Sequence, residues 1–227
     1  MKHITVAVVL FTASVAGAQT PADPSGHWKG SIEIPGRTLE LEIDLARNGA
    51  GELVGTASSA DAKNIPLAKV ALVGQAMTFY TRSDQPFTGT LGANGKSMAG
   101  TLTLSGYSLP LELTRTGDAK IEAPPTSAPI AKAFEGRWSG ALRTGAGDLR
   151  VVLTLANRPD GGSSGMFISL DEGGMMLPVR IRQQAADVTI ELNGIDGVYS
   201  GTLNAAGTEL TGMFTQRGAS LPLTLTR

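Results

Sequence analysis

The sequence predicts an all-β protein built of two small, tandem antiparallel barrels. Three observations predict this class. Apolar and polar residues alternate with the period of two that is typical of strands, and helical spacing is nearly absent. Glycine is abundant, with 29 among 227 residues, and Asn-Gly and Pro-Gly pairs interrupt the apolar runs. The second half of the chain also repeats the motifs of the first half in the same order.

An export signal precedes the predicted barrels. Lys2 supplies a positive charge, Ile4 to Val15 form an apolar run of twelve, and Ala16-Gly17-Ala18 is a small-residue cleavage site. Twelve apolar residues are too few to cross a bilayer, which takes about twenty. We therefore expect residues 1–18 to be a signal peptide of a secreted or periplasmic protein without a membrane span. The alternative is an uncleaved, buried element.

The repeat defines the domain organisation. The run Gly26-His27-Trp28-Lys29-Gly30 returns as Gly136-Arg137-Trp138-Ser139-Gly140. The run Ser108 to Arg115 returns as Ser220 to Arg227 at an offset that is larger by two, so the second copy has an insertion of two around Gly173-Gly174. We expect a first barrel over 19–115, a Pro- and Ala-rich, semi-rigid linker over 116–135 and a second barrel over 136–227.

Short strands follow one another within each copy. Trp28 to Ile34 form the first strand, and Leu39 to Leu45 alternate with carboxylates in the second. Further strands are predicted around residue 53 and over 67–73, 77–81, 87–91, 98–104 and 109–115. Turns as short as Asn48-Gly49 leave no room for crossover helices, so neighbouring strands are antiparallel. About eight strands per copy make a small up-and-down barrel.

Glycines and prolines shape these predicted barrels. Inward-facing glycines let a tightly coiled sheet bend and admit a large neighbour; they lie at 30, 55, 89 and 100, and again at 140, 165, 201 and 212. Four prolines lie inside strand-like runs, where they cannot donate a ladder hydrogen bond; they are Pro66, Pro110, Pro178 and Pro222. We expect edges, bulges or strand ends there, which favours a split or open barrel.

Each copy opens with Gly-x-Trp-x-Gly and closes with Leu-Pro-Leu-x-Leu-Thr-Arg. Together these motifs resemble a β-rich module of exported bacterial proteins, which often precedes an α/β-hydrolase or serine peptidase domain. The resemblance covers both copies and implies the accessory module on its own. We expect no serine-nucleophile elbow, and the mature chain offers only His27 as a base.

The copies are also similar to lipocalin and avidin barrels, which open with a Gly-x-Trp strand. Lipocalins lay a late-strand arginine across that tryptophan. By this resemblance we expect Arg115 to stack on Trp28 and Arg227 on Trp138, each pair closing one barrel end in a structural role.

Composition excludes several functions. With 19 Lys and Arg against 20 Asp and Glu, the chain lacks the basic footprint of a nucleic-acid or anionic-membrane binder. The absence of cysteine excludes disulfides and thiolate sites. Tyr80, Tyr107 and Tyr199 are too scattered to stack single-stranded nucleic acid. We expect no cofactor and no metal.

The strand carboxylates are the first candidate chemical group. Glu40, Glu42 and Asp44 could serve glycoside hydrolysis or calcium binding, but the second copy has Arg150, Val152 and Thr154 there. We interpret them as a solvated strand face. His27 has outward parity and is replaced by Arg137, which argues against catalysis or metal binding.

The loops hold the other candidates. Ser59-x-Asp61 recurs as Ser169-x-Asp171, and we interpret both as structural turns, with a polar binding rim as the alternative. Residues 171–176, with two methionines, are interpreted as a flexible surface loop or an adaptable contact.

The sequence therefore favours an exported, non-enzymatic tandem β-module that docks to a protein partner and has no catalytic residues. The alternative is a lipocalin-like binder of a small apolar ligand, because eight-stranded barrels are either filled by side chains or hold one small ligand. A carboxylate-dependent hydrolase is a third hypothesis. The ligand-binding residues are unknown at this stage.

Overall fold

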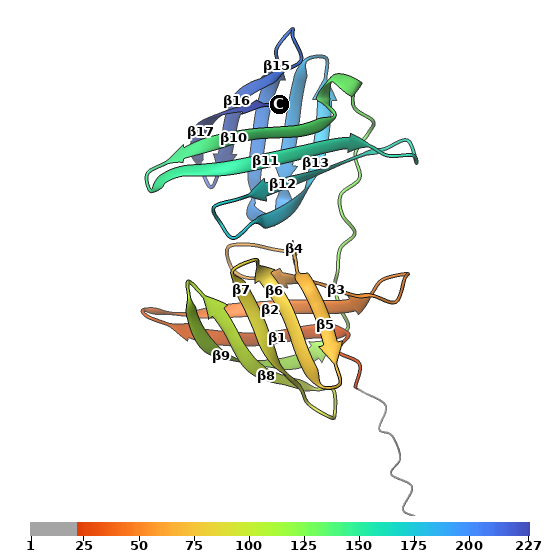
Figure 1. The fold of residues 1–227 in the computed structure, drawn as a ribbon, viewed down its shortest axis with the longest axis vertical. Helices are drawn as coiled ribbons and strands as arrows, with labels where there is room; N and C mark the ends of the chain where they lie inside the picture. Colours follow the sequence, from red (N-terminus) through yellow and green to blue (C-terminus); the bar gives the residue numbers. More distant parts are fainter. Residues whose placement is uncertain (1–21) are drawn as a thin grey trace, which may run out of the picture.

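The computed structural model describes residues 22–227, which form two antiparallel sheets joined by an extended segment. The sheets lie one above the other along the long axis, and the segment 118–131 runs beside them (Figure 1). This confirms the predicted all-β class with two barrels. The predicted signal peptide, residues 1–18, lies outside the described residues. Within 22–227, no helix is long and apolar enough to span a membrane.

The first barrel is split. Its nine strands follow the order β4-β3-β2-β1-β9-β8-β7-β6-β5, and its hydrogen bonding is interrupted between β4 and β5. The chain pairs with β3 as far as Leu67, whose N–H donates to Gly55 O, and then continues beside β6 alone. The strands are β1 (Gly26–Ile34), β2 (Arg37–Arg47), β3 (Leu53–Ser58), β4 (Ile65–Pro66), β5 (Ala68–Val73), β6 (Ala76–Arg82), β7 (Gln85–Leu91), β8 (Ser97–Leu104) and β9 (Tyr107–Gly117).

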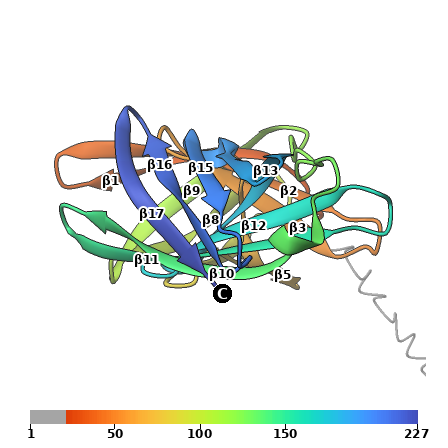
Figure 2. The same cartoon turned by 90° about the horizontal axis from the view of Figure 1, so that it is seen from above.

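The second barrel is closed, with eight strands in sequence order from β10 to β17. Figure 2 shows this barrel from above, with β10 and β17 converging near the C-terminus. A 3-10 turn, η1 (Lys132–Phe134), precedes it. The elements are β10 (Gly136–Thr144), β11 (Gly147–Asn157), β12 (Ser163–Ser169), β13 (Met175–Gln184), β14 (Asp187–Leu192), η2 (Asn193–Ile195), β15 (Gly197–Leu203), β16 (Glu209–Gln216) and β17 (Ala219–Thr226).

The strand prolines lie where one of the two flanking ladders has ended. Pro110 pairs with β8, but the β1–β9 ladder reaches only Glu112. Pro222 likewise pairs with β16, beyond the short ladder between β10 and β17. A missing N–H costs nothing on a side that has no partner strand. The second barrel therefore closes despite its two prolines, Pro178 and Pro222.

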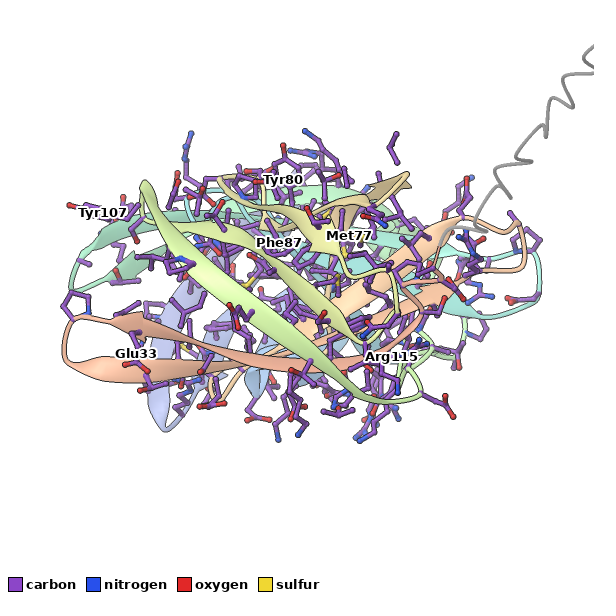
Figure 3. The ribbon with its side chains drawn as sticks, turned by 90° about the horizontal axis from the view of Figure 1, so that it is seen from below. Glu33, Met77, Tyr80, Phe87, Tyr107 and Arg115 are labelled. Atoms are coloured by element: carbon purple, nitrogen blue, oxygen red, sulfur yellow. The ribbon has the colours of Figure 1, made fainter. Side chains whose placement is uncertain are left out.

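Each barrel hides its own apolar interior. Trp28 and Trp138 are fully buried, and each indole N–H donates to a backbone carbonyl four residues earlier. Phe79 and Phe87 stack in the first barrel with ring centroids 4.6 Å apart; Figure 3 shows Phe87 and Met77 on its inner side. A Cβ on Gly30 would overlap the carbonyl oxygen of Glu112 on β9, so this position requires glycine.

Candidate functional site: the cleft between the barrels

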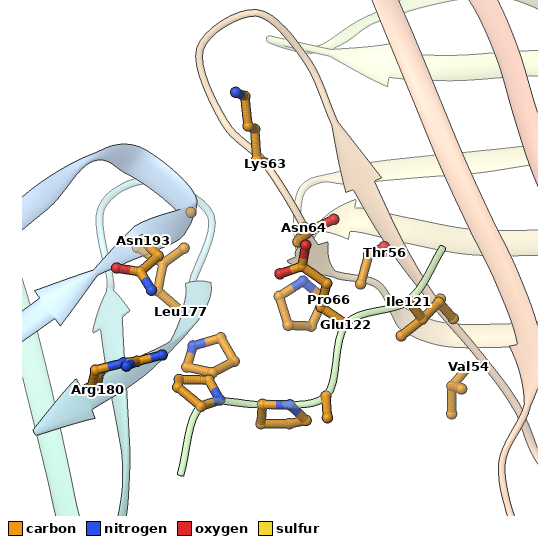
Figure 4. Close-up of a pocket in the computed structure, with 16 residues that line it drawn as sticks. Val54, Thr56, Lys63, Asn64, Pro66, Ile121, Glu122, Leu177, Arg180 and Asn193 are labelled. Carbon is orange, nitrogen blue, oxygen red and sulfur yellow. The ribbon is translucent and has the colours of Figure 1, made fainter. Parts of the chain in front are cut away.

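A half-open cleft of about 520 Å³ lies between the two barrels. Figure 4 shows its two walls, with Thr56 and Asn64 on the first barrel facing Arg180 and Asn193 on the second. The linker forms the remaining side. The lining residues are Val54, Gly55, Thr56, Lys63, Asn64, Pro66, Ile121–Pro125, Leu177, Pro178, Arg180, Asn193 and Gly194.

The cleft combines apolar walls with a few charged and polar groups. Arg180 on β13 and Glu122 in the linker both line the cleft. The Arg180 Nε lies 3.9 Å from a carboxylate oxygen of Glu191 on β14. The Thr56 hydroxyl is buried and has no hydrogen-bond partner among the described residues. An apolar cavity with a few convergent polar groups is the usual form of a binding site.

Two pairs of loops join the barrels. In the β3–β4 loop, Lys63 N–H donates to Gly194 O in η2, at 2.7 Å. Ser83 N–H, in the β6–β7 turn of the first barrel, likewise donates to Gly173 O in the β12–β13 loop, at 2.8 Å. At the offset of the sequence repeat, the β3–β4 and β12–β13 loops are equivalent, as are the β6–β7 and β14–β15 turns. The barrels thus meet through the same two loops, as the subunits of a two-fold dimer do.

Side chains reinforce this contact. Ile65 belongs to the first barrel by sequence but packs in the apolar core of the second. Arg217 lies 3.0 Å from the Asp61 carboxylate across the junction.

Residues 171–176 are not a free surface loop, contrary to one sequence interpretation. Gly173 accepts a hydrogen bond from the first barrel, and Met175 packs against the core of the second. The insertion of two residues in the second copy lies in this loop, around the Gly173 that bonds to Ser83. The alternative interpretation, an adaptable contact, describes the geometry better, and the surface contacted belongs to the same chain.

A second cavity, of about 230 Å³, lies at the mouth of the first barrel near the split. Four leucines contribute to its lining, together with Met175 of the second barrel; the leucines are Leu39, Leu41, Leu102 and Leu104. Arg82 also lines this cavity, and its Nε is buried without a hydrogen-bond partner among the described residues. The chemistry of this mouth suits a small apolar group beside one guanidinium.

His27 and Asp44 are buried, which corrects their interpretation as part of a solvated face. Their exposed fractions are 3% and 4%, and His27 Nδ1 lies 2.8 Å from Asp44 Oδ1. The linker covers them, since Lys120 N–H donates to the same Asp44 oxygen and the Thr116 hydroxyl donates to His27 O. The alternation along the strands correctly predicted that the side chains of His27 and Asp44 point out of the barrel. It could not show that the linker covers this outer face.

The other two carboxylates of this strand remain exposed, as the sequence predicts. Glu40 is exposed, and Glu42 accepts a 2.6 Å bond from Lys29 on the neighbouring strand. The hydrogen bond from the Lys29 ammonium lowers the pKa of Glu42 below its ordinary value. Neither glutamate lines either described cavity.

The paired Ser-x-Asp runs form turns. Asp61 N–H donates to the Ser59 hydroxyl at 3.4 Å. Asp171 accepts from Arg150 through both its backbone N–H and its guanidinium, and the guanidinium hydrogen bond lowers the pKa of Asp171. Ser169 is buried, and its hydroxyl has no partner among residues 22–227.

Contrary to expectation, the chain contains the sequence pattern of a nucleophile elbow once. Residues Gly161 to Gly165 read Gly-x-Ser-x-Gly. Gly161 and Gly162 end the loop between β11 and β12, and Ser163 is the first residue of β12, so the run is not a strand-to-helix turn. Ser163 is fully buried, and its hydroxyl donates to Ala128 O. This serine is therefore a structural hydrogen-bond donor to the linker.

The four residues assigned a structural role lie in pairs. The Arg227 guanidinium lies 4.2 Å from the centre of the Trp138 ring, and that of Arg115 lies 5.9 Å from the Trp28 ring. The tyrosines do not form one surface: Tyr107 is 73% exposed, Tyr80 lies under Lys69, and Tyr199 is buried with its hydroxyl donating to Leu210 O. Burial raises the pKa of Tyr199 well above its ordinary value.

Sequence reasoning missed the cleft residues. Val54, Glu122 and Arg180 come from β3, the linker and β13, and no motif connects them. The sequence had singled out three of the lining residues, but for structural reasons: Gly55, and the prolines at the equivalent positions 66 and 178.

No family model and no curated protein matches the chain. Two solved structures align with most of it, each at 12% identity. One is described as a "putative outer membrane protein" of Bacteroides fragilis NCTC 9343 and has a TM-score of 0.29, with 89% of this chain and 95% of that chain covered. The other is a protein of unknown function from the DUF3598 family of Nostoc punctiforme PCC 73102, with a TM-score of 0.27 and 88% and 94% covered.

Proposed function

We propose that the protein is an exported, non-enzymatic interaction module that holds a partner protein in the cleft between its barrels. The observation that carries the proposal is the position of the 520 Å³ cleft: it lies between the barrels and is lined by both of them and by the linker. The apolar start of the chain supports export, and the resemblance to an accessory β-module supports a docking role.

The surroundings of His27 also support a non-enzymatic role. It is the only histidine of the chain expected after signal cleavage, and its Nε2 is buried without a hydrogen-bond partner among the described residues. A general base has to come within hydrogen-bond reach of its substrate. The cover of linker and strand over His27 keeps a substrate away from this nitrogen.

A small apolar ligand in the mouth of the first barrel is the second candidate function. The leucine-lined cavity of about 230 Å³ favours it, because that volume accommodates a short acyl chain or a ring system but no folded segment. This candidate differs from the first in both ligand class and place.

Site-specific photo-crosslinking in the producing cells tests the proposal. A photoreactive residue at Val54 and one at Arg180 should give adducts with the same protein, because these positions lie on opposite walls of the cleft. The matched controls are Val73 and Tyr107, which are exposed elsewhere on the first barrel. Glu122→Trp should fill the cleft and abolish both adducts, whereas Glu33→Trp should leave them unchanged.

Either of two results would overturn the proposal. One is the absence of a shared adduct from the two walls. The other is a stoichiometric lipid, detected by native mass spectrometry of the purified chain, that protects the leucine-lined mouth and leaves the cleft unchanged; this result would establish the second candidate.

A further inference from the structure

The linker completes the wall of the second barrel by adding a short extended segment to it. Ser127 pairs with Ser163, the first residue of β12, in an antiparallel bridge with N–H···O distances of 3.3 and 2.8 Å. The Ser127 hydroxyl also accepts a hydrogen bond from Ile181 N–H on β13. The segment Ser127–Ile130 therefore lies between β12 and β13, where the two strands have separated beyond Gly165.

Side chains anchor this segment. Asn157 at the end of β11 accepts from Ile130 N–H and donates to Ile130 O, at 2.9 and 2.8 Å. The Ser163 hydroxyl donates to Ala128 O. The Ile130 side chain is 6% exposed and packs in the core of the barrel.

Among residues 22–227, no strand fills the equivalent gap of the first barrel. At the repeat offset, Leu53 corresponds to Ser163, and β4 pairs with β3 only at Thr56 and Ala57. Gly55 O accepts from Leu67 N–H on this side. Because strand residues alternate in direction, the N–H and C=O of Leu53 point to the same side as those of Gly55. In the described chain, no strand pairs with Leu53 there.

The repeat also identifies the counterpart of the filling segment in the first copy. The residues that correspond to Ser127–Ile130 are 17–20, which lie outside the described part of the chain. Cleavage after Ala18, as the signal sequence predicts, removes residue 17, the counterpart of Ser127. The mature protein then lacks the residue that would form the bridge to Leu53.

We propose that this gap, at the start of β3, is a docking site for an extended, apolar segment of a partner protein, which adds to β3 as an antiparallel strand. The inference rests on the proposed function and names the chemistry of the partner segment. Such strand addition supplies affinity through main-chain hydrogen bonds and specificity through alternate side chains.

The residues around the gap define what it accepts. In the first barrel, Leu53 stands at the position of Ser163 and Arg47 at that of Asn157. The first barrel therefore lacks the hydroxyl and the amide that anchor the segment in the second barrel. Affinity must come from the backbone of Leu53 and from apolar contact with its side chain, which is only half-buried. The gap is next to the cleft, since Val54 and Gly55, which follow Leu53 in β3, line the cleft.

The experiment uses the full mature chain and a synthetic peptide with the sequence of residues 124–131, the segment that fills the second barrel. With saturating peptide, hydrogen exchange at the Leu53 amide should slow by about tenfold or more, because the amide gains a hydrogen bond. Exchange at Ser163, whose partner is already in place, should not change. A peptide in which Ile130 is replaced by Asp should not slow exchange at Leu53.

Two variants separate backbone pairing from side-chain effects. Leu53→Pro removes the donor at a strand's first residue, where proline is tolerated, and it should abolish binding of the labelled peptide measured by fluorescence anisotropy. Leu53→Ala keeps the N–H and should retain binding. The chemical shift of the Trp28 indole proton reports whether each variant is folded.

Three outcomes overturn the inference: no change at Leu53 with peptide, equal binding by a folded Leu53→Pro variant, or a Leu53 amide already protected in the free chain, which would show that residues 19–21 or a second copy fill the gap. These failures are distinguishable from failure of the proposed function. If the adducts from Val54 and Arg180 persist while the peptide has no effect, the cleft binds a partner by another mode.

Discussion

At the scale of single residues, each barrel is organised around one buried tryptophan. The indole N–H of Trp28 donates to Pro24 O and that of Trp138 to Phe134 O, so burial leaves no donor unsatisfied. The guanidinium groups of Arg115 and Arg227 lie over the two indole rings, and the faces of these rings attract their positive charge. A large apolar side chain in a small barrel stabilises it mainly through the contacts it makes.

Truncation of these residues tests this role. Trp28→Ala or Trp138→Ala should lower the free energy of unfolding of the affected barrel by about 3–5 kcal/mol, because a large cavity remains. Arg227→Met should cost more than Arg115→Met, since its guanidinium lies closer to the ring, with both losses within about 0.5–2 kcal/mol. Urea denaturation followed by circular dichroism measures these effects.

The control for this series is Tyr107→Ala, at a side chain that is 73% exposed and should have little effect on stability. In each tryptophan variant, fluorescence of the remaining tryptophan reports the intact barrel separately. An unchanged denaturation midpoint in Trp28→Ala would show that the residue is not part of a stabilising core.

At the scale of elements, the two barrels differ most where β3 and β12 begin. The linker fills the gap in the second barrel through Asn157 and Ser163, whereas the first barrel has Arg47 and Leu53 there. The split of the first barrel is a separate difference: its chain is interrupted between β4 and β5, where the second barrel has the continuous strand β13. Identical topology does not guarantee identical edges, because a single added segment satisfies backbone groups that are otherwise unpaired.

Asn157→Ala tests the anchoring of the linker. The change leaves the N–H and C=O of Ile130 without their partner, so it should destabilise the second barrel by about 1–3 kcal/mol and speed exchange at the Ile130 amide. Hydrogen exchange followed by mass spectrometry measures both effects. Arg47→Ala, the equivalent change in the first barrel, should leave the linker unchanged; equal effects of the two variants would contradict the anchoring role.

At the scale of the whole molecule, the reciprocal loop contacts unite the barrels. Ile65 of the first barrel packs in the apolar core of the second barrel, and Arg217 and Asp61 form an exposed ion pair across the junction. Exposed ion pairs contribute little, so the apolar contact and the two backbone hydrogen bonds account for most of the coupling. The cleft exists only while this junction holds.

Ile65→Ala should uncouple the barrels. The lost apolar contact costs about 2–5 kcal/mol, much of it from the junction, so calorimetry should resolve two unfolding transitions that lie further apart than in the parent chain. Val73→Ala, at an exposed position on β5, is the control. If the Ile65→Ala profile matches that of the parent, the barrels are held together by other contacts.

The features that could be predicted from the sequence are those that depend on residues close together along the chain or on the repeat. Period-two alternation, turn pairs and the internal repeat predicted the strands and the two barrels, because each can be recognised in the order of the residues along the chain. The pairings of Trp28 with Arg115 and of Trp138 with Arg227 were suggested by parity and by resemblance. Parity also placed Asp44 on the outer face, where it lies.

Tertiary structure alone decided the rest. The burial of His27 and Asp44, the cleft and the filling of only one of two equivalent gaps all depend on where the linker lies. A Pro-rich linker has no periodicity that would reveal its contacts, and its hydrogen bonds reach far along the chain: Lys120 bonds to a residue 76 positions away and Ile130 to one 27 positions away. Alternation along a strand specifies which way a side chain points, whereas only the assembled molecule specifies what lies in that direction.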